Sequence, residues 1–128
     1  MQGNQTDGFI SKRIKSFGHA FSGVAIFFKE TTHAKVHAVA TLLVLACAFY
    51  FKVSITEWCL LLLAAGLVLG LEALNSALEY VVDLVSPDFH PLAKKAKDVA
   101  ASAVLMASIL AAAVGIIVLW PYFQLLLF

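Results

Sequence analysis

Charged residues are scarce in this sequence. Only 13% of its 128 residues are Asp, Glu, Lys or Arg, whereas 62% are hydrophobic. Soluble domains usually carry about 25% charged residues, so this composition excludes an ordinary soluble protein and favours one embedded in a membrane. We expect a single domain, residues 1–128. The net charge of +1 says little about partners, and we expect no nucleic acid among them.

The sequence also has few cysteines and no nucleotide-binding glycine loop. Its two cysteines, Cys47 and Cys59, cannot define a disulfide framework and are expected to be free, buried thiols. No Walker-type glycine loop is present, so any nucleotide must be bound in another way. The N-terminal region mixes basic and apolar residues and lacks a compact apolar segment followed by a cleavage site, so we expect no signal peptide.

Three apolar runs approach or exceed the roughly 20 residues that a helix needs to cross a bilayer. We expect spans over about 36–53, 58–85 and 97–127. Thr56 stands where an N-cap of the second span would be, and the two prolines that follow this span resist its continuation. The fold class is therefore predicted to be all-α and integral to the membrane, with three transmembrane helices.

A further helix over about 9–30 is predicted before the spans. Its large apolar residues recur at 4-3-4-3-4 spacing with basic residues on the other side, which indicates an amphipathic helix in the membrane interface. The apolar residues of this helix are Ile10, Ile14, Phe17, Phe21, Val24 and Phe28.

Lysine and arginine concentrate before the first span and between the second and third, so the N-terminus is expected in the cytoplasm and the C-terminus outside.

Polar residues interrupt the second span on one face. At 100° per residue they fall within an arc of roughly 100°. Ionisable groups at membrane depth are costly and usually functional. If Trp58 marks the outer interface, a hydrocarbon core of about 30 Å places Glu72 about 9 Å beneath the cytoplasmic boundary. The five residues are Glu72, Asn75, Ser76, Glu79 and Asp83.

The oxygen atoms of this stripe suit Mg²⁺, which proteins usually bind through one or two carboxylates together with substrate phosphates. Lysines just beyond the second span could meet phosphate oxygens, and this combination indicates phosphoryl transfer. Glu72, which lies deeper, could accept the proton of an alcohol held at headgroup level. The lysines are Lys94, Lys95 and Lys97.

Other interpretations remain open at this point. The carboxylates could pair with lysines and merely hold the helices together. A non-enzymatic scaffold or channel subunit could use them to line a cation path, but the outer half of the span, Leu60 to Leu69, is wholly apolar. His33 and His37 are four residues apart and form at most an incomplete zinc site. A stripe of small residues on the opposite face predicts close packing between subunits: Gly66, Gly70, Ala73 and Ala77.

The segment Glu72-Ala-Leu-Asn-Ser-Ala-Leu-Glu-Tyr-Val-Val-Asp83, with Ala-Lys97-Asp98 downstream, resembles the signature of the small prokaryotic diacylglycerol kinase and undecaprenol kinase family. The resemblance extends over essentially the whole chain, and residues 82–94 look closer to the undecaprenol kinase branch. It implies an ATP- and Mg²⁺-dependent kinase for a lipid alcohol at the cytoplasmic leaflet of the bacterial inner membrane. The preferred substrate is undecaprenol, with diacylglycerol as the alternative. The family works as a homotrimer with sites shared between subunits.

The resemblance also implies roles for individual residues. Glu72 would be the general base and Glu79 a metal ligand. Glu72 would contact the lipid together with Ser76 and Ser102. The residues expected at the nucleotide are Asn75, Asp83, Lys97 and Asp98, with Lys12, Lys15 and His19 on the surface helix.

One departure from the family pattern concerns a second metal-binding glutamate at the end of the surface helix. Aligned without gaps on His37, the expected Glu falls on Thr31 and the expected Asn on His33. Glu30 comes one residue early, a rotation of 100° on a helix. Either Glu30 substitutes as the metal ligand through a local shift, or the metal has fewer protein ligands, which would leave a weakened or altered kinase.

Overall fold

The computed structural model describes residues 8–127, which form four α-helices. These are α1 (Phe9–Glu30), α2 (Thr32–Phe51), α3 (Ile55–Val85) and α4 (Pro91–Leu127). Helices α2, α3 and α4 are long and apolar enough to cross a bilayer. The prediction of an all-helical chain with three candidate spans is therefore confirmed.

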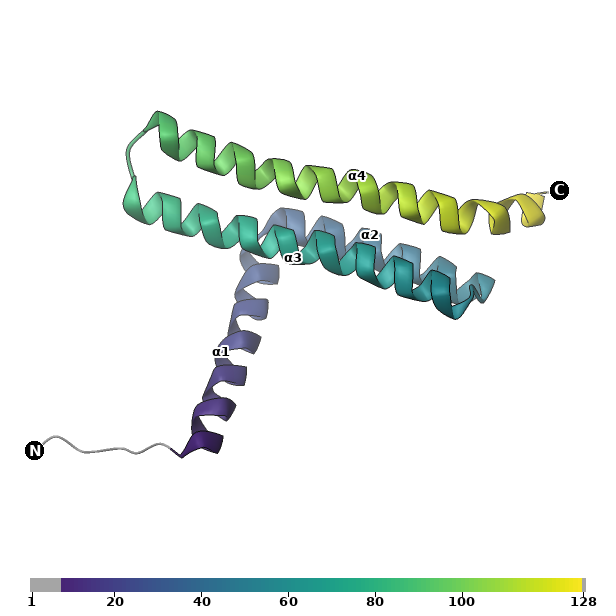
Figure 1. The fold of residues 1–128 in the computed structure, drawn as a ribbon, viewed down its shortest axis with the longest axis horizontal. Helices are drawn as coiled ribbons and strands as arrows, with labels where there is room; N and C mark the ends of the chain where they lie inside the picture. The colour runs from purple at the N-terminus through teal and green to yellow at the C-terminus, as the bar shows by residue number, and fades with distance from the viewer. Residues whose placement is uncertain (1–7, 128) are drawn as a thin grey trace, which may run out of the picture.

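Helices α2, α3 and α4 run side by side, and α3 and α4 form a long antiparallel hairpin with the most extensive packing in the chain (Figure 1). Helix α1 leaves this group at a steep angle, from a point partway along α3 (Figure 1). The exposed fractions of its apolar side chains Ile10, Ile14, Phe17 and Phe21 are between 65% and 73%.

The helix ends differ from the expected spans for local reasons. Helix α2 begins at Thr32 because Thr31 has an extended backbone (φ −94°, ψ 112°) that separates it from α1. It ends at Phe51, because Lys52 adopts a left-handed conformation (φ 52°, ψ 47°) that terminates the helix. Helix α4 begins at Pro91 rather than near residue 97, because proline is well tolerated in the first turn of a helix.

The N-cap of α3 is Ser54, so the assignment of this role to Thr56 was wrong. The Ser54 side chain accepts a hydrogen bond from the Glu57 N–H (3.4 Å), and the Ser54 N–H donates to Glu57 Oε2 (2.7 Å). This reciprocal capping box satisfies backbone donors that have no partner within the helix. The Tyr122 hydroxyl also donates to Glu57 Oε2 (2.8 Å), which joins α4 to the start of α3.

Apolar packing is concentrated at the same end of the hairpin. Phe51 stacks on Tyr122 with ring centroids 5.7 Å apart and meets Phe123 edge-on at 4.8 Å. Cys47 is half-buried beside this cluster, whereas Cys59 is exposed, so the expectation of two buried thiols was wrong for Cys59. The buried members of the cluster are Ala48, Val53, Leu61, Val118 and Leu119.

The capping box yields a stability prediction. Ser54→Ala should lower the free energy of unfolding by about 1 kcal/mol, because the Glu57 N–H loses its acceptor. Thr56→Ala, the matched control, should change it by less than about 0.5 kcal/mol, as expected for a surface substitution without such a role. Chemical unfolding in detergent micelles measures both. Equal losses for the two variants would contradict the assignment of Ser54 as the cap.

Candidate active site

The junction between α1 and α2 contacts α3 at the turn that holds Ser76 and Tyr80. The hydroxyl oxygens of Thr31 and Ser76 lie 3.2 Å apart, and the Tyr80 hydroxyl donates to Glu30 Oε2 at 3.1 Å. A groove of about 440 Å³ lies between the second half of α1 and this part of α3. The C-terminal end of α3 and the first turns of α4 project past the level of α1 (Figure 1).

Three of the five stripe residues are buried in the single chain. The exposed fractions are 3% for Glu72, 9% for Asn75 and 6% for Ser76. The Ser76 hydroxyl donates to the backbone carbonyl of Glu72 (3.0 Å). Within residues 8–127 the carboxylate of Glu72 takes part in no hydrogen bond or ion pair. A buried carboxylate without a partner is therefore held one turn beneath the α1–α2 junction.

Asn75 and Glu79 interact along the helix. The Asn75 Nδ2 group donates to Glu79 Oε1 (3.1 Å), while Asn75 Oδ1 is buried without a hydrogen-bond partner. Because Glu30 bonds to Tyr80, the residue after Glu79, the last residue of α1 lies beside the turn of α3 that carries Glu79. Two carboxylates and an unpaired amide oxygen therefore lie within neighbouring turns of two helices that contact each other.

The backbone at the α1–α2 junction bears on the departure from the family pattern, in which the expected metal-binding glutamate aligns with Thr31. The expected 100° rotation between Glu30 and Thr31 assumed one continuous helix, but α1 ends at Glu30 and Thr31 is extended. The backbone break lets Glu30 contact Tyr80 while the side chain of Thr31 contacts Ser76. Tyr80 was not identified from the sequence. Its place within the Glu72–Asp83 motif was the available signal.

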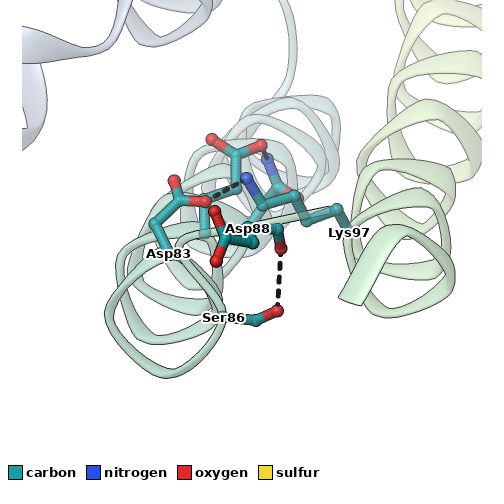
Figure 2. A network of polar contacts seen from close by, with 6 residues as sticks. Asp83, Ser86, Asp88 and Lys97 are labelled. Carbon is teal, nitrogen blue, oxygen red and sulfur yellow. Dashed lines mark hydrogen bonds and ion pairs between the residues drawn. The ribbon is translucent and has the colours of Figure 1, made fainter. Parts of the chain in front are cut away.

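Two further acidic residues, Asp83 near the end of α3 and Asp98 on α4, form ion pairs with lysines. Lys97 Nζ lies 2.5 Å from Asp83 Oδ1 and joins α4 to α3, as Figure 2 shows. In the connecting turn the Ser86 hydroxyl donates to the backbone carbonyl of Asp88 (3.0 Å). Asp98 pairs with Lys94 one turn away on α4. The Asp83–Lys97 pair therefore joins two helices, whereas the Asp98–Lys94 pair lies within α4.

Several expected site residues do not lie near Glu72 and Glu79 of their own chain. The first half of α1, which carries Lys12, Lys15 and His19, points away from α3 and α4 (Figure 1). Ser102 is exposed, and its hydroxyl donates to the carbonyl of Val99 (2.7 Å). Within the part of the chain that the structure describes, no three His, Cys, Asp or Glu side chains gather into a metal-binding group, so His33 and His37 belong to no such group there.

The arrangement suits a hard cation and an anionic ligand. Oxygen atoms of Glu30, Glu79 and Asn75 are the kind of ligand that Mg²⁺ takes, and two carboxylates are the usual protein contribution. The amide oxygen of Asn75, buried without a partner, is an additional free acceptor. Lysines in the first turns of α4 provide positive charge on the same side.

Comparison with known proteins identifies the family of the chain. The family model described as prokaryotic diacylglycerol kinase matches residues 18–119. An undecaprenol kinase of Bacillus subtilis is 38% identical over 112 residues, covering 88% of this chain and 91% of the relative. A diacylglycerol kinase of Escherichia coli is 35% identical over 120 residues, covering 94% and 98%. One of Synechocystis is 41% identical over 107 residues, covering 83% and 61%. The chain therefore belongs to the prokaryotic diacylglycerol kinase family, a family of lipid kinases.

Proposed function

We propose that this bacterial membrane protein transfers the γ-phosphoryl group of ATP, with Mg²⁺, to the hydroxyl of a membrane lipid at the cytoplasmic leaflet. The observation that carries the proposal is the side chain of Glu72, 3% exposed and without a partner, beneath the turn of α3 where Tyr80, the neighbour of Glu79, binds Glu30 of α1. Seven residues separate Glu72 from Glu79, about 10 Å along the helix axis. The lipid hydroxyl and the nucleotide phosphates would lie between these two carboxylates.

Undecaprenol is the proposed substrate, with undecaprenyl phosphate as product. The undecaprenol kinase of Bacillus subtilis matches with 38% identity and covers most of both chains, and residues 82–94 resemble that branch. Diacylglycerol is the alternative, which would make phosphatidic acid, because the relatives from Escherichia coli and Synechocystis are diacylglycerol kinases. Both substrates present one hydroxyl at headgroup level, so the same acidic residues would serve either.

The chain's own residues divide the chemistry between two depths. Glu72, as general base, accepts the proton of the lipid hydroxyl while the hydroxyl oxygen bonds to the γ-phosphorus and the bond from that phosphorus to ADP breaks. Glu79 and Glu30 would hold the metal, and Asn75 would orient Glu79 and offer its free oxygen. Bound Mg²⁺ and ATP supply the phosphoryl group and neutralise the charge on its oxygens. Asp83, Lys97 and Asp98 would border the nucleotide phosphates from the projecting helix ends.

The proposal includes a homotrimer with shared sites, a cytoplasmic N-terminus and an external C-terminus in the inner membrane. The direction of α1 supports sharing, because its first half, which carries Lys12, Lys15 and His19, extends away from α3 and α4 of its own chain and could reach a neighbour (Figure 1). Ser102, exposed on α4, could likewise contact lipid or a neighbouring chain. The positions Gly66 and Gly70 face open space in the single chain, which leaves room for a second helix.

The first experiment measures phosphoryl transfer from Mg²⁺–ATP to undecaprenol and to diacylglycerol in mixed micelles. We expect transfer to undecaprenol to be the more efficient. Glu72→Gln should lower kcat by about 10²- to 10⁴-fold, because it removes the proton acceptor. Asp88→Asn, which removes an exposed acid in the α3–α4 turn, should leave kcat unchanged. If wild type makes no more product than Glu72→Gln with either lipid, the protein is not a kinase for these alcohols.

A second prediction concerns the carboxylate at the end of α1. Glu30→Gln should raise the Mg²⁺ concentration for half-maximal activity by about tenfold or more, because one of two carboxylate ligands is lost. Thr31→Ala should change this concentration by less, since the Thr31 hydroxyl carries no charge and contacts Ser76 and Tyr80 rather than the metal. Activity measured across a Mg²⁺ titration gives both values. A larger effect at Thr31 than at Glu30 would exclude Glu30 as the metal ligand.

A third prediction separates packing within the chain from packing between chains. A Cβ atom at Gly70 would meet nothing within 4 Å, so the single chain can accept Gly70→Leu. We expect this variant to lose the trimer and most activity, because a large side chain blocks close approach of a neighbouring helix. Gly115→Leu on α4, equally unobstructed, is the control. Light scattering of the detergent-purified protein reports the mass, and an active, full-size Gly70→Leu assembly would refute this interface.

A further inference from the structure

A second cavity lies where α2, α3 and α4 meet, apart from the carboxylates. Its volume is about 240 Å³ and its walls are mostly alanine, valine and leucine. A dry cavity of about 150 Å³ accommodates benzene, so this one has room for roughly ten carbon atoms. Three polar residues also line it, namely His37, Thr41 and Ser108.

The hydroxyl of Ser108 differs from that of three other helical serines. Ser16, Ser76 and Ser102 each donate a hydrogen bond to a carbonyl of their own helix. The oxygen of Ser108 is buried and has no partner, not even in α4. Native proteins rarely leave a buried hydroxyl unsatisfied, so this hydroxyl is available for a ligand in the cavity.

The register of the α3–α4 hairpin gives the depth of Ser108. Lys97 bonds to Asp83 at one end, and Leu119 packs with Leu61 at the other. The two helices are antiparallel with the same rise per residue. Ser108 follows Lys97 by as many residues as Glu72 precedes Asp83, so Ser108 is level with Glu72.

Resting on the kinase function, we propose that Ser108 is a substrate-binding residue whose hydroxyl donates a hydrogen bond to the oxygen of the lipid alcohol. The first carbons of the lipid chain occupy the cavity, which is apolar and at membrane depth. With its oxygen bound by Ser108, the alcohol keeps its own proton directed at a second acceptor. Glu72, buried at the same level without a partner, is that acceptor.

The kinetic test compares Ser108→Ala with Ser108→Thr and with Ser86→Ala, a control in the α3–α4 turn. Loss of one neutral hydrogen bond should raise KM for undecaprenol about 3- to 10-fold in Ser108→Ala, with KM for ATP unchanged. Ser108→Thr keeps the hydroxyl and should restore the lipid KM, and Ser86→Ala should match wild type. An unchanged lipid KM in an active Ser108→Ala enzyme would overturn the inference while leaving the kinase function intact.

A binding test without ATP uses Ala111→Leu, which fills the cavity from α4. Undecaprenol should raise the Tm of the detergent-purified wild type, raise it less in Ser108→Ala and leave Ala111→Leu unchanged. A full lipid-dependent Tm shift in Ala111→Leu would show that the hydrocarbon chain of the lipid binds elsewhere. A change in its oligomeric mass would show that the cavity receives a neighbouring subunit, and either result overturns the inference. Failure of wild type to phosphorylate any lipid alcohol would instead refute the kinase function.

Discussion

The structure depends on burying the polar face of α3 away from lipid. Glu72, Asn75 and Ser76 are nearly inaccessible although they belong to an otherwise apolar span. A polar or charged side chain facing hydrocarbon is costly, so this face must turn towards other helices. Helices α2 and α4 and the α1–α2 junction cover it, and the Thr31–Ser76 contact fixes where α1 meets the bundle. The requirement to shield a few polar atoms thus determines the arrangement of all four helices.

The acidic residues at this end of the molecule fall into two groups with different surroundings. Asp83 and Asp98 are exposed and paired with lysines, and such surface pairs contribute little to stability. Glu72 has no partner, and Glu79 contacts only the amide of Asn75. The buried acid, Glu72, is therefore the one without a partner, and half-buried Glu79 has a neutral partner but no cation. This contrast is what favours a chemical role for Glu72 and Glu79 over a structural one.

The fold followed from the sequence because long apolar runs and turn residues are local signals. Three spans and a preceding helix could be identified from periodicity and length alone. The ends of the helices were less predictable. The break at Thr31 depends on its contact with Ser76, and the cap at Ser54 depends on Glu57, which Tyr122 also contacts from the far end of the chain. The Thr31–Ser76 and Tyr122–Glu57 contacts join residues far apart in the sequence, so no local pattern reveals them, whereas the Ser54-x-x-Glu57 capping box is a local pattern that the choice of Thr56 missed.

The sequence by itself determined that this chain enters a membrane and that its acids share one helix face, because composition and helical periodicity are properties of a single segment. It also carried the motif that identifies the family. Only the tertiary structure decided which acids are paired, that Glu30 approaches the turn of Glu79, and that Ser108 is level with Glu72 without a partner. These properties depend on distances between different helices, which packing sets.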